Sequence, residues 1–287
     1  MSATIKLSSP ATREFWEIPV LFEDTHLLAL DKPAGLLTAP DRNDPAQPSL
    51  MSLLHAAIAA GKPWAVERDL TYLNPAHRLD AGTSGVILLA KSKPVLVALA
   101  NQFGTDQPQA KYGALVRGVP RAEQFDVEAK IALDPLHPGL MRVDSRQGKR
   151  AKTSVSVGEA FRDYVWLTCR PVTNRTHQIR VHLRHTGLPI VGDLLYGGKP
   201  LLLSRLKRDY RLKPGRTERP LLERVALHSE ELVLVHPITN AAVTFIAPCP
   251  KDLRVALKYL REHGGTTFRR AGVSGDEGLR PAHLILI

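Results

Sequence analysis

Short hydrophobic runs, each bounded by turn residues, recur along the N-terminal third of the chain. Such runs predict β-strands, here over residues 20–23, 26–31 and 86–90. Residues 49–60 have apolar side chains three and four positions apart behind a serine, a pattern typical of a capped helix. A second helix is predicted from Ser92 to about Phe103, because Pro94 suits a first helical turn. Residues 1–18 show neither pattern and are predicted to be an irregular leader.

The rest of the chain is richer in strand patterns. Helices are predicted over residues 176–185 and 251–262, and strands over residues 112–117, 153–157, 165–170, 226–235 and 242–246. Residues 134–152 and the charged connector 197–224 are predicted to be loops, and residues 264–287 a loosely held tail. The pattern therefore predicts one α+β domain over residues 19–263, with a mixed, mainly antiparallel sheet flanked by helices and loops.

The balance of charge narrows the class of partner. The 287 residues include 39 lysines and arginines against 28 aspartates and glutamates, a net charge of +11, while 44% are hydrophobic, which excludes wholesale disorder. The positive excess favours nucleic acid as partner, ahead of an anionic membrane surface. No apolar run approaches the roughly 18–20 residues that span a bilayer. Because no signal peptide is recognisable and the only cysteines are Cys169 and Cys249, we expect a soluble cytoplasmic protein.

The positive charge is concentrated in three segments. Residues 142–152 carry a net charge of +4 and residues 205–224 a net charge of +5, and four arginines between residues 170 and 184 have no acidic neighbour in sequence. Any one such run is typical of a solvated surface, but three together predict a one-sided basic surface that binds the phosphate backbone. Since only 6% of residues are aromatic, strands that stack on single-stranded bases are not expected.

The segment HRLDAGTSG at residues 77–85 contains the strongest candidate chemistry. Asp80 stands where a turn leads into a predicted strand, and the small residues after it let a substrate approach the backbone closely. Arg78 precedes Asp80 by two positions, so in an extended segment both side chains face the same way. The alternative is a purely structural turn, in which Asp80 caps local N–H groups and pairs with Arg78.

This segment resembles the catalytic motif of the RluA-type pseudouridine synthases. Four further blocks resemble motifs of that family in the same order along the chain, at residues 31–35, 111–118, 174–193 and 226–237. Together the five blocks span about residues 20–250. The resemblance implies the pseudouridine synthase catalytic fold, and an isomerase that detaches uracil from its ribose in RNA, rotates the base and rejoins it through carbon 5.

The resemblance also implies roles for individual residues. Asp80 matches the nucleophilic aspartate, Tyr112 the tyrosine that stacks on uracil and is assigned a proton-abstracting role, and Arg180 the arginine that pairs with the aspartate. Arg78 matches the arginine beside the extruded base. Further substrate-binding residues are expected within the matched blocks, namely His77, Thr83, Lys111, Arg175 and His177.

These residue types suit the chemistry. Burial alone would raise the pKa of a nucleophilic carboxylate, and an adjacent arginine counteracts this while fixing the orientation of the carboxylate. Tyrosine offers a flat face for the base and a phenol that relays a proton. No metal or organic cofactor is required. Attack of Asp80 on the ring and assistance to departure of the base from the sugar both remain open. We expect a monomer that acts on structured RNA, ribosomal RNA ahead of transfer RNA.

Two positions depart from the family pattern. Asn174 and Asn240 replace glycines, and asparagine is the residue that best tolerates positive φ after glycine. The small RNA-binding domain that many relatives carry ahead of the catalytic domain has no room before residue 19, so we expect the catalytic domain itself to bind RNA.

Two other functions compete with this interpretation. A metal hydrolase would use His177, His182 and His185, but only the last two have helical ligand spacing and no glutamate lies nearby to act as base. A non-catalytic RNA-binding protein with the same fold is the stronger rival. The presence of Asp80, Tyr112 and Arg180 together favours the enzyme.

Overall fold

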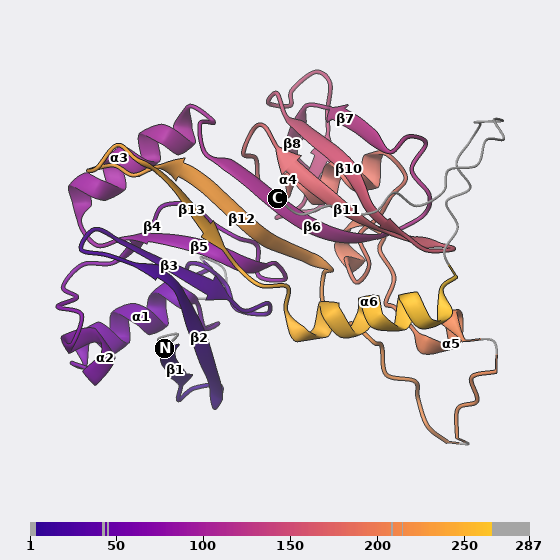
Figure 1. The fold of residues 1–287 in the computed structure, drawn as a ribbon, viewed down its shortest axis with the longest axis horizontal. Coiled ribbons are helices and arrows are strands. Elements are labelled where there is room, and N and C mark those ends of the chain that lie inside the picture. The colour runs from indigo at the N-terminus through magenta and orange to yellow at the C-terminus, as the bar shows by residue number, and fades with distance from the viewer. Residues whose placement is uncertain (1–3, 42–43, 45, 208, 214, 266–287) are drawn as a thin grey trace, which may run out of the picture.

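A computed structural model describes residues 4–41, 44, 46–207, 209–213 and 215–265 of the chain, shown in Figure 1. The helices are α1 (Leu50–Ala59), α2 (Pro63–Val66), α3 (Lys93–Gly104), α4 (Gln178–His185), the 3-10 helix η1 (Leu194–Tyr196), α5 (Leu203–Leu206) and α6 (Lys251–His263). The strands are β1 (Thr4–Ser9), β2 (Glu14–Glu23), β3 (Leu27–Lys32), β4 (Asn74–Pro75), β5 (Ser84–Ala90), β6 (Gln109–Arg117), β7 (Gln124–Glu128), β8 (Ile131–Leu133), β9 (Met141–Val143), β10 (Lys152–Ala160), β11 (Tyr164–Pro171), β12 (Leu227–Val235) and β13 (Ala242–Ile246).

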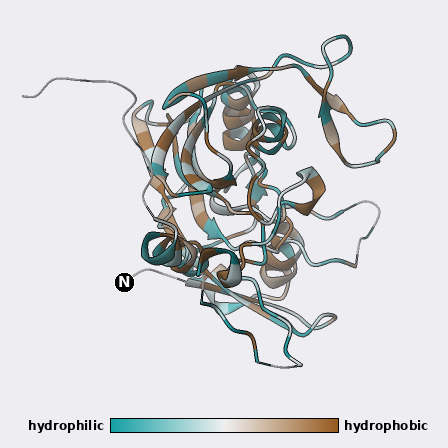
Figure 2. Ribbon diagram, turned by 90° about the vertical axis from the view of Figure 1, so that its right-hand side faces the viewer, coloured by the Kyte–Doolittle hydropathy of each residue, from teal (hydrophilic) through white to brown (hydrophobic). Residues whose placement is uncertain are grey.

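One sheet of 11 strands forms the body of the described chain, in the order β1-β2-β3-β5-β12-β6-β11-β10-β7, with β13 beside β12 and β4 beside β5. All its neighbours run antiparallel except β5 and β12, which pair in parallel through Ser84 with His228 and Gly85 with Ser229. Along several strands of Figure 2 hydrophobic and hydrophilic segments alternate, as expected for strands with one buried face. The predicted α+β class with a mainly antiparallel sheet is confirmed.

Local sequence explains the elements that were predicted correctly. Ser49 caps α1, because its hydroxyl accepts a hydrogen bond from the backbone N–H of Ser52 while the Ser52 hydroxyl accepts one from the N–H of Ser49. Strand β5 is buried at every position, which accounts for its continuous apolar sequence. Asn240 adopts a φ of 55°, as expected at a position of glycine-like backbone, whereas Asn174 has no positive φ.

The prediction of an irregular leader over residues 1–18 is wrong for the part that the structure describes. Residues 4–9 and 14–18 belong to the antiparallel strands β1 and β2. The sequence TIKLSS alternates exposed and buried positions, so Ile5 and Leu7 pack with Ile18 in the core. The alternation of exposed and buried residues is too short to predict a strand by itself. The strand forms because its backbone pairs with β2.

The segment 134–152 also differs from the predicted loop, since β9 lies within it and pairs with β8 to form a small separate hairpin. The connector 197–224 is mainly irregular, as predicted, with the short helix α5. Residues 266–287 of the predicted tail lie outside the described residues. Among the described residues no helix is long and apolar enough to cross a membrane.

The buried side chains form several clusters along the sheet, and two of them meet near its centre. One cluster joins β6, β10 and β11 to α4 and α6, and a second joins β1, β2 and β3 to α1. Tyr112 of β6 packs against both clusters. The junction of the two clusters is therefore the place where the loop before β5, strand β6 and helix α4 converge.

Close packing at the start of β5 depends on Gly85. Its φ is +113°, in the region that favours glycine, and a Cβ atom there would collide with the backbone carbonyl of Ser229 on β12. Glycine thus permits the parallel pairing directly behind the loop that contains Asp80.

We expect Gly85→Ala to destabilise the protein through both effects. Positive φ costs an alanine about 1–2 kcal/mol, and overpacking adds roughly 1–3 kcal/mol. Gly139→Ala is the matched control, because Gly139 has a φ of +84° but nothing within 4 Å of the added Cβ. Urea unfolding of both variants measures the difference. Equal losses would contradict a role for the close approach to β12.

Candidate active site

Seven of the nine predicted site residues line one cavity at the junction of the two clusters: Arg78, Asp80, Thr83, Tyr112, Arg175, His177 and Arg180. They come from the loop before β5, from β6, and from α4 with the segment that precedes it. The tertiary fold therefore brings together residues that are a hundred positions apart in sequence.

Residues 32–38 hold the loop that presents Asp80. The ammonium of Lys32, fully buried, donates to the carbonyls of Pro33 at 2.8 Å and Leu36 at 2.6 Å, and lies 3.4 Å from that of Ala81. Thr38 donates through its hydroxyl to the carbonyl of Leu79 at 2.8 Å. Burial lowers the pKa of Lys32 to about 7. The carbonyl oxygens of Pro33 and Leu36 take the place of the water that the buried side chain loses. Sequence analysis identified residues 31–35 only as a block that resembles a family motif.

Arg180 connects two carboxylates and forms a trio with Asp193 and Asp80. Its Nε and Nη2 donate to the two oxygens of Asp193 at 2.8 Å each, and its Nη1 donates to Oδ2 of Asp80 at 3.0 Å. The side chains of Arg180 and Asp193 are only 6% and 1% exposed, whereas that of Asp80 is 27% exposed. The buried pair with Asp193 therefore fixes the guanidinium, and its third donor orients Asp80 toward the cavity.

The electrostatics of the trio keep Arg180 charged. Burial acts to lower the pKa of Arg180, but the carboxylates of Asp193 and Asp80 outweigh this and raise it. The guanidinium also lies over the ring of Tyr196, 4.8 Å from its centroid. Asp193 and Tyr196 are functional candidates that the sequence analysis missed. Asp193 had a sequence signal, since it lies inside the matched block 174–193, but the residue that it pairs with depends on the fold, and Tyr196 lies outside the matched blocks.

Tyr112 forms another wall of the cavity. It is half-buried, and its hydroxyl hydrogen-bonds to Ser229, its neighbour in register on β12. Burial, and secondarily the charge of Asp80, raise the pKa of Tyr112 to about 12 despite the hydrogen bond. The group in the cavity is therefore a neutral phenol near neutral pH.

The other cavity residues differ in exposure. Arg78 is exposed and lies at the edge of the cavity, and the half-buried Arg175 donates to the carbonyl of Arg150 at 3.2 Å. Thr83 is 2% exposed, and its hydroxyl has no hydrogen-bond partner within the described part of the chain. His177 places its Nε2 3.8 Å from Oδ1 of Asp80.

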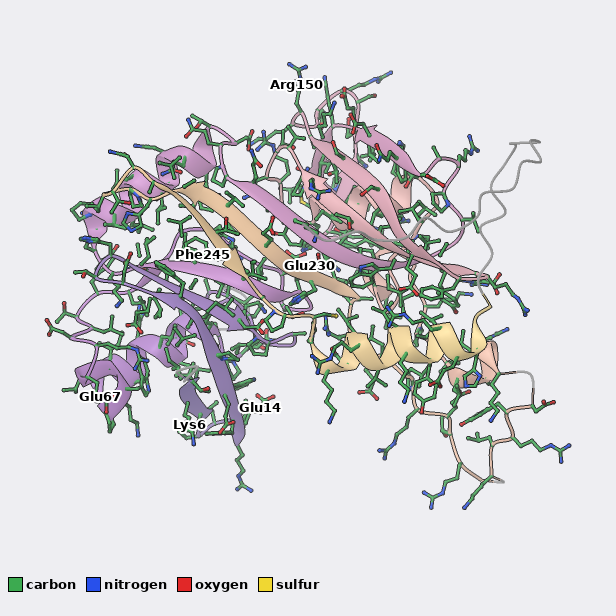
Figure 3. The ribbon with its side chains drawn as sticks, viewed as in Figure 1. Lys6, Glu14, Glu67, Arg150, Glu230 and Phe245 are labelled. Atoms are coloured by element: carbon green, nitrogen blue, oxygen red, sulfur yellow. The ribbon has the colours of Figure 1, made fainter. Side chains whose placement is uncertain are left out.

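Two predicted substrate-binding residues do not line this cavity. The Nε2 atom of His77 accepts a hydrogen bond from the N–H of Leu88, and the ring stacks on Phe103, so burial lowers its pKa to about 4. Lys111 pairs with Glu230 at 2.9 Å, because neighbouring residues of a strand point to opposite faces of the sheet. Glu230, labelled in Figure 3, lies on the central strand β12.

The histidines of α4 do not form a metal site. His182 is fully buried with its two ring nitrogens 2.9 Å from the hydroxyl of Thr153 and the carbonyl of Ala129, while His185 is exposed. No group of three or more His, Cys, Asp or Glu side chains in the described ranges is arranged to hold a metal ion. The metal-hydrolase alternative therefore lacks its ligand set in this part of the chain.

The family model described as RNA pseudouridylate synthase matches residues 26–185, more than half of the chain. Ribosomal large subunit pseudouridine synthase D of Xylella fastidiosa is 37% identical over 253 residues, with 88% of this chain and 72% of that protein covered. The chain belongs to the RluA-type RNA pseudouridine synthases. Ribosomal large subunit pseudouridine synthase C of Escherichia coli is 34% identical over 244 residues, covering 84% of this chain and 70% of that protein.

Solved structures agree with this assignment. Human RNA pseudouridylate synthase domain containing 4 superposes with a TM-score of 0.62 at 25% sequence identity, covering 84% of this chain and 92% of that one. The predicted family, fold and enzyme class are thus confirmed: this synthase is an isomerase that acts on RNA.

We expect Asp193→Asn to destabilise this synthase by about 3–5 kcal/mol, because it removes one partner of a buried ion pair. Glu159→Gln is the control. Glu159 accepts hydrogen bonds from Nε and Nη2 of Arg261 at 2.8 and 2.7 Å, but the two side chains are 33% and 55% exposed. An exposed pair contributes about 0–1 kcal/mol. Chemical unfolding compares the two, and similar losses would argue against a special role for buried pairing at Arg180.

Proposed function

We propose that this synthase isomerises specific uridines of structured ribosomal RNA, with Asp80 as nucleophile. The proposed RNA class rests on the relatives, several of which are named ribosomal large subunit pseudouridine synthases. The role of Asp80 rests on one observation above all others. Asp80 is the partly exposed carboxylate of the Arg180 trio, and it opens onto a cavity of which Tyr112 forms a wall.

The trio suits a nucleophilic carboxylate. Arg180 places a positive charge beside Asp80, and its single Nη1 donor binds Oδ2 without binding Oδ1. Arg180 is itself held by Asp193, so it orients the nucleophile without needing to move. Attack on the ring and assistance to departure of the base both use this arrangement.

Tyr112 would stack on the uracil as a neutral phenol. Its raised pKa of about 12 disfavours a standing phenolate, so proton abstraction by Tyr112 would require its own proton to move at the same time. The hydrogen bond to Ser229 provides the first acceptor or donor for such a transfer.

Arg78, Thr83 and Arg175 are the candidates for substrate binding in the cavity. The exposed guanidinium of Arg78 suits the space that an extruded base leaves, and the buried hydroxyl of Thr83 suits a polar atom of the base or a water. The side chains of His77 and Lys111 have partners within the fold and are better explained as structural. We propose that the reaction proceeds in a monomer without metal or organic cofactor.

The basic segments are distributed differently from the predicted one-sided surface. Arg180 faces inward, and Lys152 pairs with Asp126 and Glu128. The segment after α5 extends from one end of the molecule, while the region of β8 and Arg150 lies at another (Figures 1 and 3). The segment near Arg150 borders the cavity through the contact of Arg175. We therefore propose that Arg146, Lys149 and Arg150, all exposed, contact phosphates beside the target uridine.

Asp80→Asn is expected to abolish pseudouridine formation and to leave RNA binding within a few-fold of wild type, since the amide keeps the shape but not the nucleophile. Pseudouridine mapping of total RNA from cells with the wild-type gene, without it, and with the variant measures this and names the target. Turnover by Asp80→Asn would refute the nucleophile. An unchanged map in all three strains would favour a non-catalytic RNA-binding role, and a transfer RNA target would overturn the ribosomal proposal.

RNA affinity is expected to fall steeply with salt, and the triple variant of Arg146, Lys149 and Arg150 to Gln should lower the slope of log K against log salt by about 2–3. Each lost phosphate contact removes roughly 0.7–0.9 of slope. The control replaces three exposed basic residues of α6 by Gln, namely Lys251, Arg254 and Lys258. Filter binding at several salt concentrations measures both. Equal changes would point to overall charge instead of a local contact.

A further inference from the structure

A chain of polar contacts leads from the β8–β9 hairpin to Asp80. The backbone N–H of Met141 donates to the hydroxyl oxygen of Tyr196 at 2.9 Å, and that hydroxyl lies 2.7 Å from Nδ1 of His177. The other ring nitrogen of His177 lies 3.8 Å from Oδ1 of Asp80. Arg180 holds the opposite oxygen, Oδ2.

The direction of the hydrogen bond from Met141 favours one tautomer of His177. A backbone N–H only donates, so the oxygen of Tyr196 accepts from Met141 and its own proton is available for Nδ1. With Nδ1 as acceptor, the neutral ring carries its proton on Nε2, which faces the carboxylate of Asp80. The distance of 3.8 Å exceeds a hydrogen bond, but catalytic contacts often shorten when substrate binds.

The backbone of His177 is held in an uncommon conformation that directs this ring. Its φ of 55° and ψ of 18° lie in the left-handed region, immediately before α4. Non-glycine residues remain there only where surrounding structure enforces it, and such positions are concentrated at functional sites. The carbonyl of His177 accepts from the N–H of Val181 at 2.9 Å, which ties the residue to the first turn of α4.

We propose that His177 is a positioning residue for Asp80, acting as a neutral donor to Oδ1 whose tautomer Tyr196 and the β8–β9 hairpin determine. This rests on the proposed role of Asp80 as nucleophile. Two donors on the two oxygens, Arg180 and His177, would restrict rotation of the carboxylate more than Arg180 alone. The role differs from direct contact with RNA, which the resemblance implied for this histidine.

The groups that face His177 support a neutral ring. Burial is the largest effect and lowers the pKa of His177. The carboxylates of Asp80 and Asp193 act to raise this pKa, whereas the guanidinium groups of Arg180 and Arg78 act to lower it. An uncharged imidazole donates to Asp80 without adding a second full positive charge. Protonation at low pH would reverse the hydrogen bond to Tyr196, because Nδ1 would then carry a hydrogen and donate it to the hydroxyl oxygen.

The β8–β9 hairpin supports the contacts of Tyr196 and His177. Tyr196 is 1% exposed and packs with Ile131, Ala151 and Val181, next to Met141. Displacing β9 would remove the N–H donor of Met141 that orients the Tyr196 hydroxyl. The position of the hairpin would thus affect Asp80 through Tyr196 and His177.

Nitrogen-15 NMR of histidine-labelled protein tests the tautomer without any RNA. We expect the His177 ring at pH 7.5 to carry its hydrogen on Nε2, and Tyr196→Phe, which keeps the ring beside Arg180, to shift the ring toward a mixture of tautomers. A hydrogen on Nδ1 in the wild-type protein would overturn the proposal. Because no activity is measured, this outcome is independent of the proposed function.

Two amide variants test the effect on catalysis. Gln places an amide donor near the position of Nε2, whereas Asn reaches only as far as Nδ1 and suits the left-handed backbone better. We expect His177→Asn to lower the single-turnover rate by about 10–100-fold, the effect of losing a hydrogen bond to a charged group, with unchanged RNA Kd. His177→Gln should retain most of the rate, although its backbone is less favourable.

Rates are measured at saturating enzyme on the RNA that mapping identifies, and Kd by filter binding. A raised Kd with an unchanged single-turnover rate in His177→Asn would assign the residue to RNA contact and overturn positioning. Equal single-turnover rates for the Asn and Gln variants would also overturn positioning, because the donor at Nε2 would then have no effect on the rate. Inactivity of the wild-type protein on every RNA would refute the proposed function while leaving the tautomer result standing.

Discussion

The buried pairing of Arg180 with Asp193 is the constraint on which the site depends. A guanidinium that is 6% exposed remains inside a protein only when its donors have partners, and Asp193 supplies two acceptors at 2.8 Å. The donor left over is directed at Asp80. Because Asp193 precedes η1, Arg180 lies on α4 and Asp80 precedes β5, satisfying one charge requires three separate segments to meet. The same requirement that stabilises this junction therefore also orients the proposed nucleophile.

Rigid support on the other side of Asp80 comes from backbone contacts. Lys32 and Thr38 bind carbonyls of the loop at residues 79–81, and Gly85 lets β5 pair closely with β12. None of these residues contacts the reacting groups directly. Their effect is to limit how far the carboxylate shifts, which matters because a displacement of about 1 Å costs a large factor in rate. The loop of the proposed nucleophile is thus held both by Gly85, inside the segment at residues 77–85, and by Lys32 and Thr38, which lie outside it.

Sequence alone predicted the family, the α+β class and most of the central strands, because motifs and hydrophobic runs are local signals. It failed where partners are distant. Strand β1 was missed since six alternating residues carry little signal without β2, and Lys111 was assigned to the site although strand geometry turns it toward Glu230. Of the four arginines between residues 170 and 184, the resemblance singled out Arg180 as the partner of Asp80, but only the fold reveals that it is buried between two carboxylates. Asp193 and Tyr196 gained their importance from the same tertiary contacts.

Charge is divided between the interior and the edge of the site. Inside, Asp80 is balanced by Arg180, Tyr112 remains a neutral phenol, and burial favours an uncharged His177. The more exposed cations, Arg78 and the residues near Arg150, lie toward solvent. Under the proposed function, a phosphate would be attracted to the edge, where it keeps part of its hydration, and the uncharged base would meet the flat face of Tyr112 in the interior. Such a distribution of charge would admit an uncharged base and hold the RNA backbone outside, which is the separation that the proposed extrusion of a uridine requires.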